Sequence, residues 1–166
     1  MSTKICTRCN TEKDVSQFTF KFTENRYTAG CKECLAIRVR AWRSTSGGKE
    51  RVRNYRTSPH GKAVRLMVEA KERAADKNLP LTIDVPWIRA RIAAGKCQVT
   101  EIPFDMEPAG NSLGARAFGA SLDRITPKLG YTPENTQVVV WIYNRAKGVQ
   151  GHAEVMKLAE ALCQRP

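Results

Sequence analysis

Short apolar runs and polar loops alternate in the last third of the chain. Residues 120–125 mix apolar and polar side chains over a length typical of a strand, and the β-branched run 136–141 predicts a second, mostly buried strand. The connecting residues 126–135 hold Pro127, Gly130 and Pro133, which favours a structured loop. A short helix is expected after the second strand, so the order is strand, loop, strand, helix.

Helical periodicity predicts most of the remaining elements. Residues 35–43 indicate a basic helix, and apolar residues three or four positions apart predict an amphipathic helix over 62–78. Asp84-Val85-Pro86 is a typical helix start. Residues 44–48, which read Ser-Thr-Ser-Gly-Gly, are predicted to form a flexible linker. A last helix over about 153–163 is expected to pack through its apolar residues, which are Val155, Leu158, Ala159 and Leu162.

Two Cys-x-x-Cys pairs near the N-terminus indicate a metal site. Cys6 and Cys9 form one pair, Cys31 and Cys34 form the other, and 21 residues separate the pairs. Two such turns supply the tetrahedral four-sulfur set that Zn²⁺ accepts, whereas two disulfides would need an oxidising compartment. Since all four ligands are cysteines, we expect a structural zinc that stabilises a small N-terminal module.

The basic charge of the chain is unevenly distributed. Residues 1–80 carry 18 basic and 8 acidic side chains, whereas residues 81–166 carry 10 and 8. The densest stretch, Arg38 to Arg65, contains Glu50 as its only acidic residue. A polyanion such as nucleic acid is therefore the expected partner, because Lys and Arg contacts to phosphate release condensed counterions. A well-solvated basic surface is the alternative interpretation.

Composition excludes several other classes. Hydrophobic residues make up 42% of the chain and charged residues 27%, which is typical of a folded globular protein rather than a disordered or fibrous one. The sequence has no apolar run of membrane-spanning length, and its first residues lack the apolar stretch of a signal peptide. We therefore expect a cytoplasmic protein with no membrane partner.

Three segments in the C-terminal part follow one another in the order of a known motif. They are Ser121-Leu122-Asp123-Arg124-Ile125, Gly130-Tyr131-Thr132-Pro133-Glu134-Asn135 and Asn144-Arg145-Ala146-Lys147. This order resembles the ββα-metal motif of HNH endonucleases over roughly residues 95–148. Some phage recombination endonucleases and rare-cutting restriction enzymes of this class also carry paired Cys-x-x-Cys zinc sites, which extends the resemblance to the N-terminus.

The resemblance implies a role for several residues. Asp123 and Asn144 match the metal-binding positions of the family, and two oxygen ligands with waters and phosphate suit Mg²⁺ or Mn²⁺. Asn135 matches the middle Asn of the motif, which holds the loop by hydrogen bonds. Arg145 and Lys147 could reach DNA phosphates from the same helix, although ordinary charge at a helix C-terminus is an equal alternative.

The sequence departs from the family where most members place a histidine general base. Arg124 stands there, and a guanidinium does not lose its proton, so Arg124 would hold phosphate or stabilise charge instead. The remaining candidate for the base is Tyr131, which the metal or Arg124 would have to activate; packing of this tyrosine on the hairpin is the alternative. The two histidines, His60 and His152, lie outside the motif.

These observations predict an α+β protein in three parts: a four-cysteine zinc-ribbon-like module over 1–43, a basic helical connector over 44–94, and a ββα-metal nuclease domain with a C-terminal helix over 95–166. The predicted function is Mg²⁺-dependent hydrolysis of double-stranded DNA by a phage-related or mobile-element nuclease, acting in the host cytoplasm if it is of phage origin. Symmetric double-strand cleavage would need a homodimer. The expected DNA contacts are Arg38, Arg40, Arg43, Arg51, Arg53, Arg56, Lys62, Arg65, Arg145 and Lys147.

Two alternatives remain open at this point. The missing histidine favours a non-catalytic, zinc-dependent DNA-binding protein whose nuclease motif has decayed. An RNA-directed protein is the other alternative, and it ranks lower because the basic connector lacks the interleaved aromatic residues that single-stranded RNA usually requires.

Overall fold

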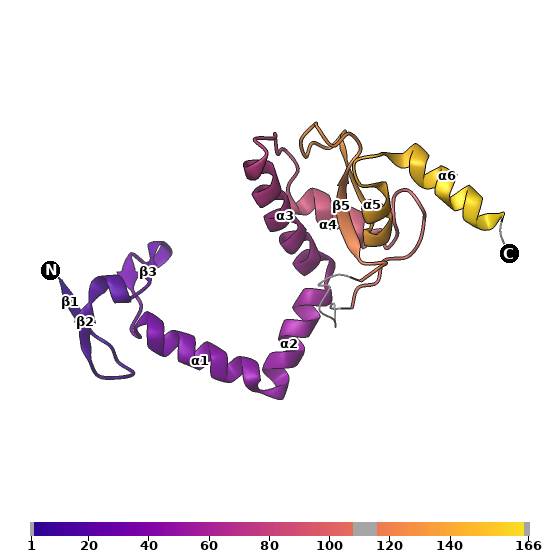
Figure 1. Cartoon of the computed structure of the whole chain (residues 1–166). Coiled ribbons are helices and arrows are strands. Elements are labelled where there is room, and N and C mark those ends of the chain that lie inside the picture. The colour runs from indigo at the N-terminus through magenta and orange to yellow at the C-terminus, as the bar shows by residue number, and fades with distance from the viewer. Residues whose placement is uncertain (1, 108–115, 165–166) are drawn as a thin grey trace. The chain divides into compact units, whose positions relative to one another are not determined.

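The computed structural model of the chain describes residues 2–107 and 116–164 (Figure 1). The chain forms two compact units, Met1–Val52 and Arg53–Pro166. Both contain helices and small antiparallel two-stranded sheets, so the predicted α+β class is confirmed. The finer division into three parts, at residues 43 and 94, stays a prediction.

The first unit begins with two short hairpins. β1 (Thr3–Ile5) pairs with β2 (Glu12–Asp14), and β3 (Phe20–Lys21) pairs with β4 (Arg26–Tyr27). Single 3-10 turns follow β2 and β3, over Val15–Gln17 and Phe22–Glu24.

The apolar core of this first unit is very small. Cys6, Phe18 and Cys31 are its buried members, and Cys34 packs against them. Phe22 lies outside β3 and has 87% of its surface exposed, so it adds nothing to this core. So few buried side chains offset little of the entropy lost on folding, and a module of this size needs an additional constraint such as a metal.

Two exposed helices follow the cysteines, and the predicted flexible linker between them is wrong. A single residue, Thr45, separates α1 (Lys32–Ser44) from α2 (Ser46–Thr57). Thr45 forms the corner, because its hydroxyl oxygen accepts a hydrogen bond from the Gly48 N–H at 3.1 Å. Gly48 is buried directly against the Trp42 carbonyl, where a Cβ atom would clash, so the glycines permit a tight corner rather than a mobile link.

The second unit opens with two packed helices. α3 (Pro59–Asp76) begins after Ser58, whose hydroxyl oxygen accepts the Gly61 N–H at 3.0 Å, and α4 (Val85–Ala93) begins after Asp84, whose carboxylate accepts the Trp87 N–H at 2.8 Å. α3 and α4 pack against each other through apolar faces. The helix start predicted at Asp84 is confirmed, and α3 starts three residues earlier than its periodicity indicated.

A β-hairpin lies between these helices and a third one (Figure 1). β5 (Ala120–Arg124) pairs antiparallel with β6 (Thr136–Val140), so that Asp123 lies opposite Gln137. α5 (Trp141–Lys147) follows β6 directly and packs on the hairpin. Because side chains alternate along a strand, Leu122 and Val138 face the core with α3 and α4, whereas Asp123 and Gln137 face α5.

The loop between β5 and β6 is tied to the chain before α4. The Tyr131 N–H donates to the Pro80 carbonyl at 2.8 Å, and the Tyr131 carbonyl accepts the Thr82 N–H at 2.9 Å. Gly130 lies against the Pro80 backbone, where a Cβ atom would clash. The loop is therefore held on both sides by backbone contacts.

The last helix, α6 (His152–Cys163), differs from its prediction. None of its residues is buried, and its Leu158 and Leu162 side chains are 55% and 65% exposed instead of packed. Val155 does contact the core, and His152 Nδ1 lies 3.0 Å from the Tyr143 hydroxyl of α5. No helix within the described part of the chain combines the length and apolar character needed to cross a membrane.

Candidate functional site

Asp123 is the centre of a buried polar cluster between the hairpin and α5. The residue is 3% exposed, and both of its carboxylate oxygens accept hydrogen bonds from the Lys147 ammonium, at 3.0 Å for Oδ1 and 2.8 Å for Oδ2. Oδ2 also accepts the Gln137 Nε2–H at 2.8 Å. The carboxylate charge is therefore compensated inside the protein, as burial of a charged group requires.

Asn144 approaches the same strand from α5. Its Nδ2 group donates to the Leu122 carbonyl at 2.9 Å and to the Ser121 hydroxyl at 2.8 Å. These bonds dock α5 on β5 one residue away from Asp123. Both use the Asn144 nitrogen, so among the described residues nothing engages its Oδ1 acceptor.

Lys147 occupies a different place from the one predicted for it. The sequence placed it on a DNA phosphate, but the residue is 2% exposed and its ammonium points at the end of β5. Besides Asp123, it donates to the carbonyls of Arg124 at 2.7 Å and Ile125 at 3.1 Å. With all its partners inside the protein, Lys147 cannot contact DNA from this position.

Arg124 and Tyr131 lie together on the other face of the hairpin. The Arg124 guanidinium carbon is 5.1 Å from the centre of the Tyr131 ring, a cation–π distance, and Tyr131 is 2% exposed within the apolar core. Arg124 Nη1 is buried without a hydrogen-bond partner in the described chain. Among the described residues, neither side chain bonds to Asp123 or Asn144. The predicted constellation thus divides into two pairs on opposite faces.

Asn135 holds the loop between the strands. Its Nδ2 group donates to the carbonyls of Thr126, Leu129 and Gly130, at 3.2, 3.2 and 2.8 Å, and its Oδ1 accepts the Thr126 N–H at 2.9 Å. The residue is buried. One side chain therefore satisfies four backbone groups of a tight loop, a network that is costly to break.

The donor set around Asp123 fits a small divalent cation with few protein ligands. A carboxylate offers about four lone-pair positions, and Lys147 and Gln137 use three, which leaves one on Oδ1. With the Asn144 Oδ1 atom, Asp123 presents two hard oxygen donors, and Mg²⁺ is typically bound by one or two such groups plus waters and phosphate. The Lys147 ammonium, which bonds to both carboxylate oxygens, would be the immediate neighbour of such an ion.

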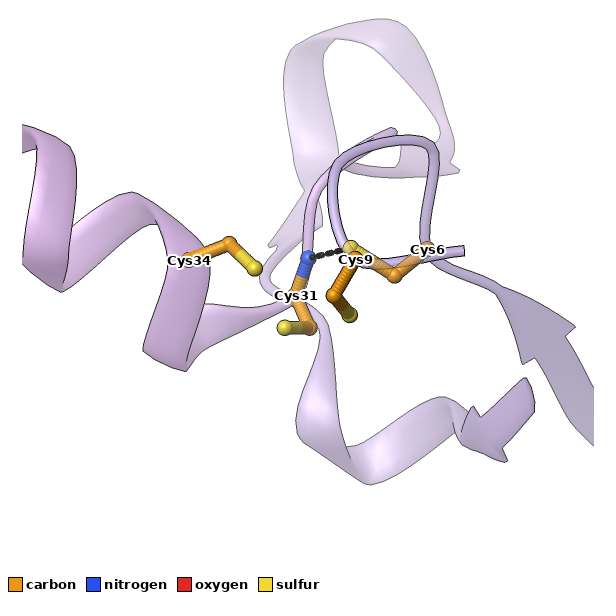
Figure 2. A group of neighbouring side chains, drawn as sticks. All are labelled: Cys6, Cys9, Cys31 and Cys34. Carbon is orange, nitrogen blue, oxygen red and sulfur yellow. Dashed lines mark hydrogen bonds between the residues drawn. The ribbon is translucent and has the colours of Figure 1, made fainter. Parts of the chain in front are cut away.

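The four N-terminal cysteines meet in one cluster (Figure 2). Their sulfur atoms all lie within 4.8 Å of one another. Cys6 and Cys9 lie on the loop after β1, and Cys31 and Cys34 lie at the start of α1. The Cys6 sulfur accepts the backbone N–H groups of Cys31 at 3.2 Å and Arg8 at 3.4 Å.

These hydrogen bonds prepare the cluster for a metal. The backbone N–H groups of Cys31 and Cys9 lower the pKa of Cys6 to about 6, whereas the neighbouring Cys31 thiol and burial raise the pKa of Cys34. The pKa of Cys9 is also lowered, chiefly by its hydrogen bond with the Thr11 hydroxyl, so two of the four thiols lose their protons more readily than a free cysteine. Four converging thiols with this chemistry fit a tetrahedral zinc ion, with Cys6, Cys9, Cys31 and Cys34 as its ligands.

The predicted DNA contacts fall into three groups. Three are engaged elsewhere. Lys147 is paired with Asp123, and Arg53 pairs with Glu107 at 2.8 Å. Lys62 is 8% exposed and points at the carbonyls of Asp105 and Glu107, and burial lowers its pKa. Arg65 pairs loosely with Glu69 on the surface of α3. The remaining side chains are exposed; they are Arg38, Arg40, Arg43, Arg51, Arg56 and Arg145.

Two members of the buried cluster were not predicted from the sequence. Gln137 could be found only from the register that places it opposite Asp123. Lys147 carried a usable signal, because it follows Asn144 by three residues and so shares its helix face. A residue on the face that docks on the hairpin is a candidate for burial rather than for solvent.

Comparisons with known proteins give little further information. No family model matches the chain, and no curated protein matches it. Among solved structures, one described as the rare-cutting HNH restriction endonuclease PacI in a study of DNA perturbation matches with a TM-score of 0.42 and 18% sequence identity. The match covers 96% of this chain and 92% of that one.

Proposed function

We propose that the protein is a metal-dependent endonuclease of the HNH class that hydrolyses phosphodiester bonds in double-stranded DNA. The observation that carries the proposal is the position of Asp123 on β5 and of Asn144 on α5. The helix is docked on the strand by the hydrogen bond from Asn144 Nδ2 to the Leu122 carbonyl. Each side chain retains an oxygen that no described residue fully engages. The exposed arginines of α1 and α2 and the net charge of +12 support a polyanionic substrate.

Each part of the site has a proposed task. Asp123 Oδ1 and Asn144 Oδ1 would hold Mg²⁺ or Mn²⁺, which when bound polarises the scissile phosphate and stabilises the leaving oxygen. Arg124 is proposed to bind phosphate once DNA binding exposes its Nη1 atom, which is buried without a described partner on the face of the hairpin opposite Asp123. Asn135 keeps the loop between β5 and β6 rigid through its hydrogen bonds to the backbone.

Tyr131 remains the proposed general base, a role that requires the substrate to reach the face of the hairpin opposite Asp123, where Tyr131 is 2% exposed. As a phenolate, its oxygen would take the proton of the attacking water and become a neutral phenol, and the Arg124 guanidinium beside the ring would stabilise the phenolate before that transfer. Replacement by phenylalanine keeps the packing of the ring and removes the hydroxyl alone. A base role predicts a cleavage rate about 10²–10⁴-fold lower for Tyr131→Phe with unchanged stability. An unchanged rate would assign Tyr131 to packing.

The four-cysteine cluster is proposed to hold one structural Zn²⁺. All four positions are thiols, so no coordination position remains open for a substrate or water. The ion would stabilise the first unit, whose three-residue core is too small to do so.

Cleavage of supercoiled plasmid tests the proposed activity. With Mg²⁺ or Mn²⁺ we expect nicked or linear DNA, and with EDTA none. Ends with a 5′-phosphate are expected, so the cut product should be religated by DNA ligase without prior phosphorylation. Structured RNA in parallel reactions should remain intact; its preferential cleavage would replace DNA as the proposed substrate.

One observation favours the second candidate, a DNA-binding protein without activity. Lys147 already compensates the Asp123 charge, so the carboxylate is satisfied without any metal ion. This candidate predicts salt-sensitive DNA binding with no cleavage under any divalent ion, and the plasmid assay separates the two.

A further inference from the structure

The ammonium of Lys147 lies beside the oxygens that the proposed metal ion would use. It is 2.8–3.0 Å from both oxygens of Asp123, and its other acceptors are the carbonyls of Arg124 and Ile125. An ammonium has three N–H donors, so these four acceptors use all of them. The residue is 2% exposed, and water screens its charge poorly.

We propose that Lys147 is a built-in counter-cation that keeps the free protein from holding its divalent ion, so that the ion binds together with the DNA phosphate. The inference rests on the function proposed above, and it assigns to Lys147 the control of when the site is loaded. Lys147 is thus a positioning residue, because it acts through Asp123 and touches neither the phosphate nor the reacting atoms.

The available ligands support this order of binding. The free protein offers one lone pair on Asp123 Oδ1 and the Asn144 Oδ1 atom, which leaves most of an octahedral shell to waters. A phosphodiester adds oxygen ligands of the kind that Mg²⁺ and Mn²⁺ prefer. More of the shell is therefore complete when DNA is present.

The charges around the site also favour binding of the ion together with DNA. Asp123 and Lys147 form a neutral pair, so a divalent ion that enters beside them meets no net negative charge and is repelled by the nearby ammonium. The phosphate brings the missing negative charge. Because binding of the two ligands is linked, the ion must strengthen DNA binding by the same factor by which DNA strengthens ion binding.

Removal of the ammonium tests the proposal. Lys147→Met keeps the aliphatic stem and deletes the charge, and its Mn²⁺ affinity in the absence of DNA is measured by isothermal titration calorimetry. We expect Mn²⁺ to bind at least about tenfold more tightly than to the wild type, a change of about 1.4 kcal/mol. Lys157→Met is the matched control, since Lys157 is exposed on α6 and pairs with Glu154. Equal affinities for all three proteins would overturn the proposal.

A second measurement decides the matter if Lys147→Met does not fold. Mn²⁺ binding to the wild type is then measured with and without a short DNA duplex. The double variant Asp123→Asn/Lys147→Met is measured with the same duplex, and its signal gives the Mn²⁺ that the DNA binds by itself. The proposal predicts at least tenfold tighter binding with DNA, whereas equal affinity overturns it.

The two proposals fail in different ways. If plasmid is cleaved with Mg²⁺ but deletion of the Lys147 charge leaves Mn²⁺ affinity unchanged, the inference about Lys147 is wrong and the nuclease function stands. If no protein binds Mn²⁺ with or without DNA and no plasmid is cut, the proposed metal site itself is wrong.

Discussion

Some residues of the motif have the neighbours that the sequence predicts, and others do not. Asp123 and Asn144 lie close together because β5 and α5 are docked by the Asn144 amide. Lys147, by contrast, was expected in solvent and is buried on Asp123. A lysine at the end of a helix is usually exposed, so its residue type and position led to the wrong expectation. The helix face that it shares with Asn144 is the better guide.

Asn135→Ala should destabilise the second unit without unfolding the first. The variant loses four hydrogen bonds and leaves buried backbone groups of the loop without partners, which costs about 2–4 kcal/mol. Urea unfolding followed by tryptophan fluorescence measures the loss. Asn54→Ala is the control, because Asn54 is exposed on α2. A loss below about 0.5 kcal/mol for Asn135→Ala would show that the loop does not depend on this side chain.

The buried ion pair should show strong coupling in a double-mutant cycle. Lys147→Met leaves the Asp123 charge buried without a partner, and Asp123→Asn leaves Lys147 in the same state, so each single change should cost about 3–5 kcal/mol. The double variant removes both charges and should recover much of that loss. Urea unfolding of the four proteins gives the coupling energy. Additive losses would mean that the two charges do not stabilise each other.

At the scale of elements, local signals were reliable where a cap or a strand pattern specified them. Asp84 begins α4 as expected, and β5 and β6 fall where the apolar runs placed them. Gly47 and Gly48 led to the wrong prediction of a flexible linker. Glycine permits either a flexible link or a close backbone approach, and only the contact of Gly48 with Trp42 decides between them. Helical periodicity also placed α6 correctly but could not show that its apolar face stays exposed.

The first unit should depend on its metal. Its core contains three buried residues, so removal of zinc by a strong chelator should expose residues 1–52 to protease while the second unit stays resistant. Limited proteolysis with mass spectrometry measures this. Metal analysis should find one zinc per chain in the wild type and in Cys163→Ser, whose side chain is exposed, and none in Cys9→Ser. Unchanged protection after chelation would contradict a structural metal.

The exposed arginines of α1 should contribute to DNA affinity through charge. Replacement of Arg40 and Arg43 by glutamine should weaken binding, and it should reduce the slope of log affinity against log salt by about 0.9 for each phosphate that the variant no longer neutralises. Arg26 and Arg73 form ion pairs with glutamates, and their replacement removes the same charge as a control. Fluorescence anisotropy over a range of salt concentrations measures both variants. Equal slopes would place the DNA-binding surface elsewhere.

At the scale of the whole molecule, the two units are stabilised in different ways. The first unit has a cysteine cluster and almost no apolar core, whereas the second has one continuous core shared by α3, α4 and the β5–β6 hairpin. The cysteine spacing was enough to predict the cysteine cluster of the first unit. For the second unit, the positions of the two strands were predicted, but not the face of the hairpin on which each residue lies. Alternation along β5 sends Arg124 and Asp123 to opposite sides, so residues adjacent in the motif are separated in space.

Cleavage of supercoiled plasmid by charge-matched variants tests whether Asp123 holds a catalytic ion. The wild type and Asp76→Asn, which removes an exposed carboxylate, should nick or linearise the plasmid with Mg²⁺. Asp123→Asn/Lys147→Met, which keeps the buried cluster neutral and should therefore remain folded by circular dichroism, should cut at least about 10³-fold more slowly. If the folded double variant cuts at the rate of the wild type, Asp123 does not hold the catalytic ion and the proposed nuclease site is wrong.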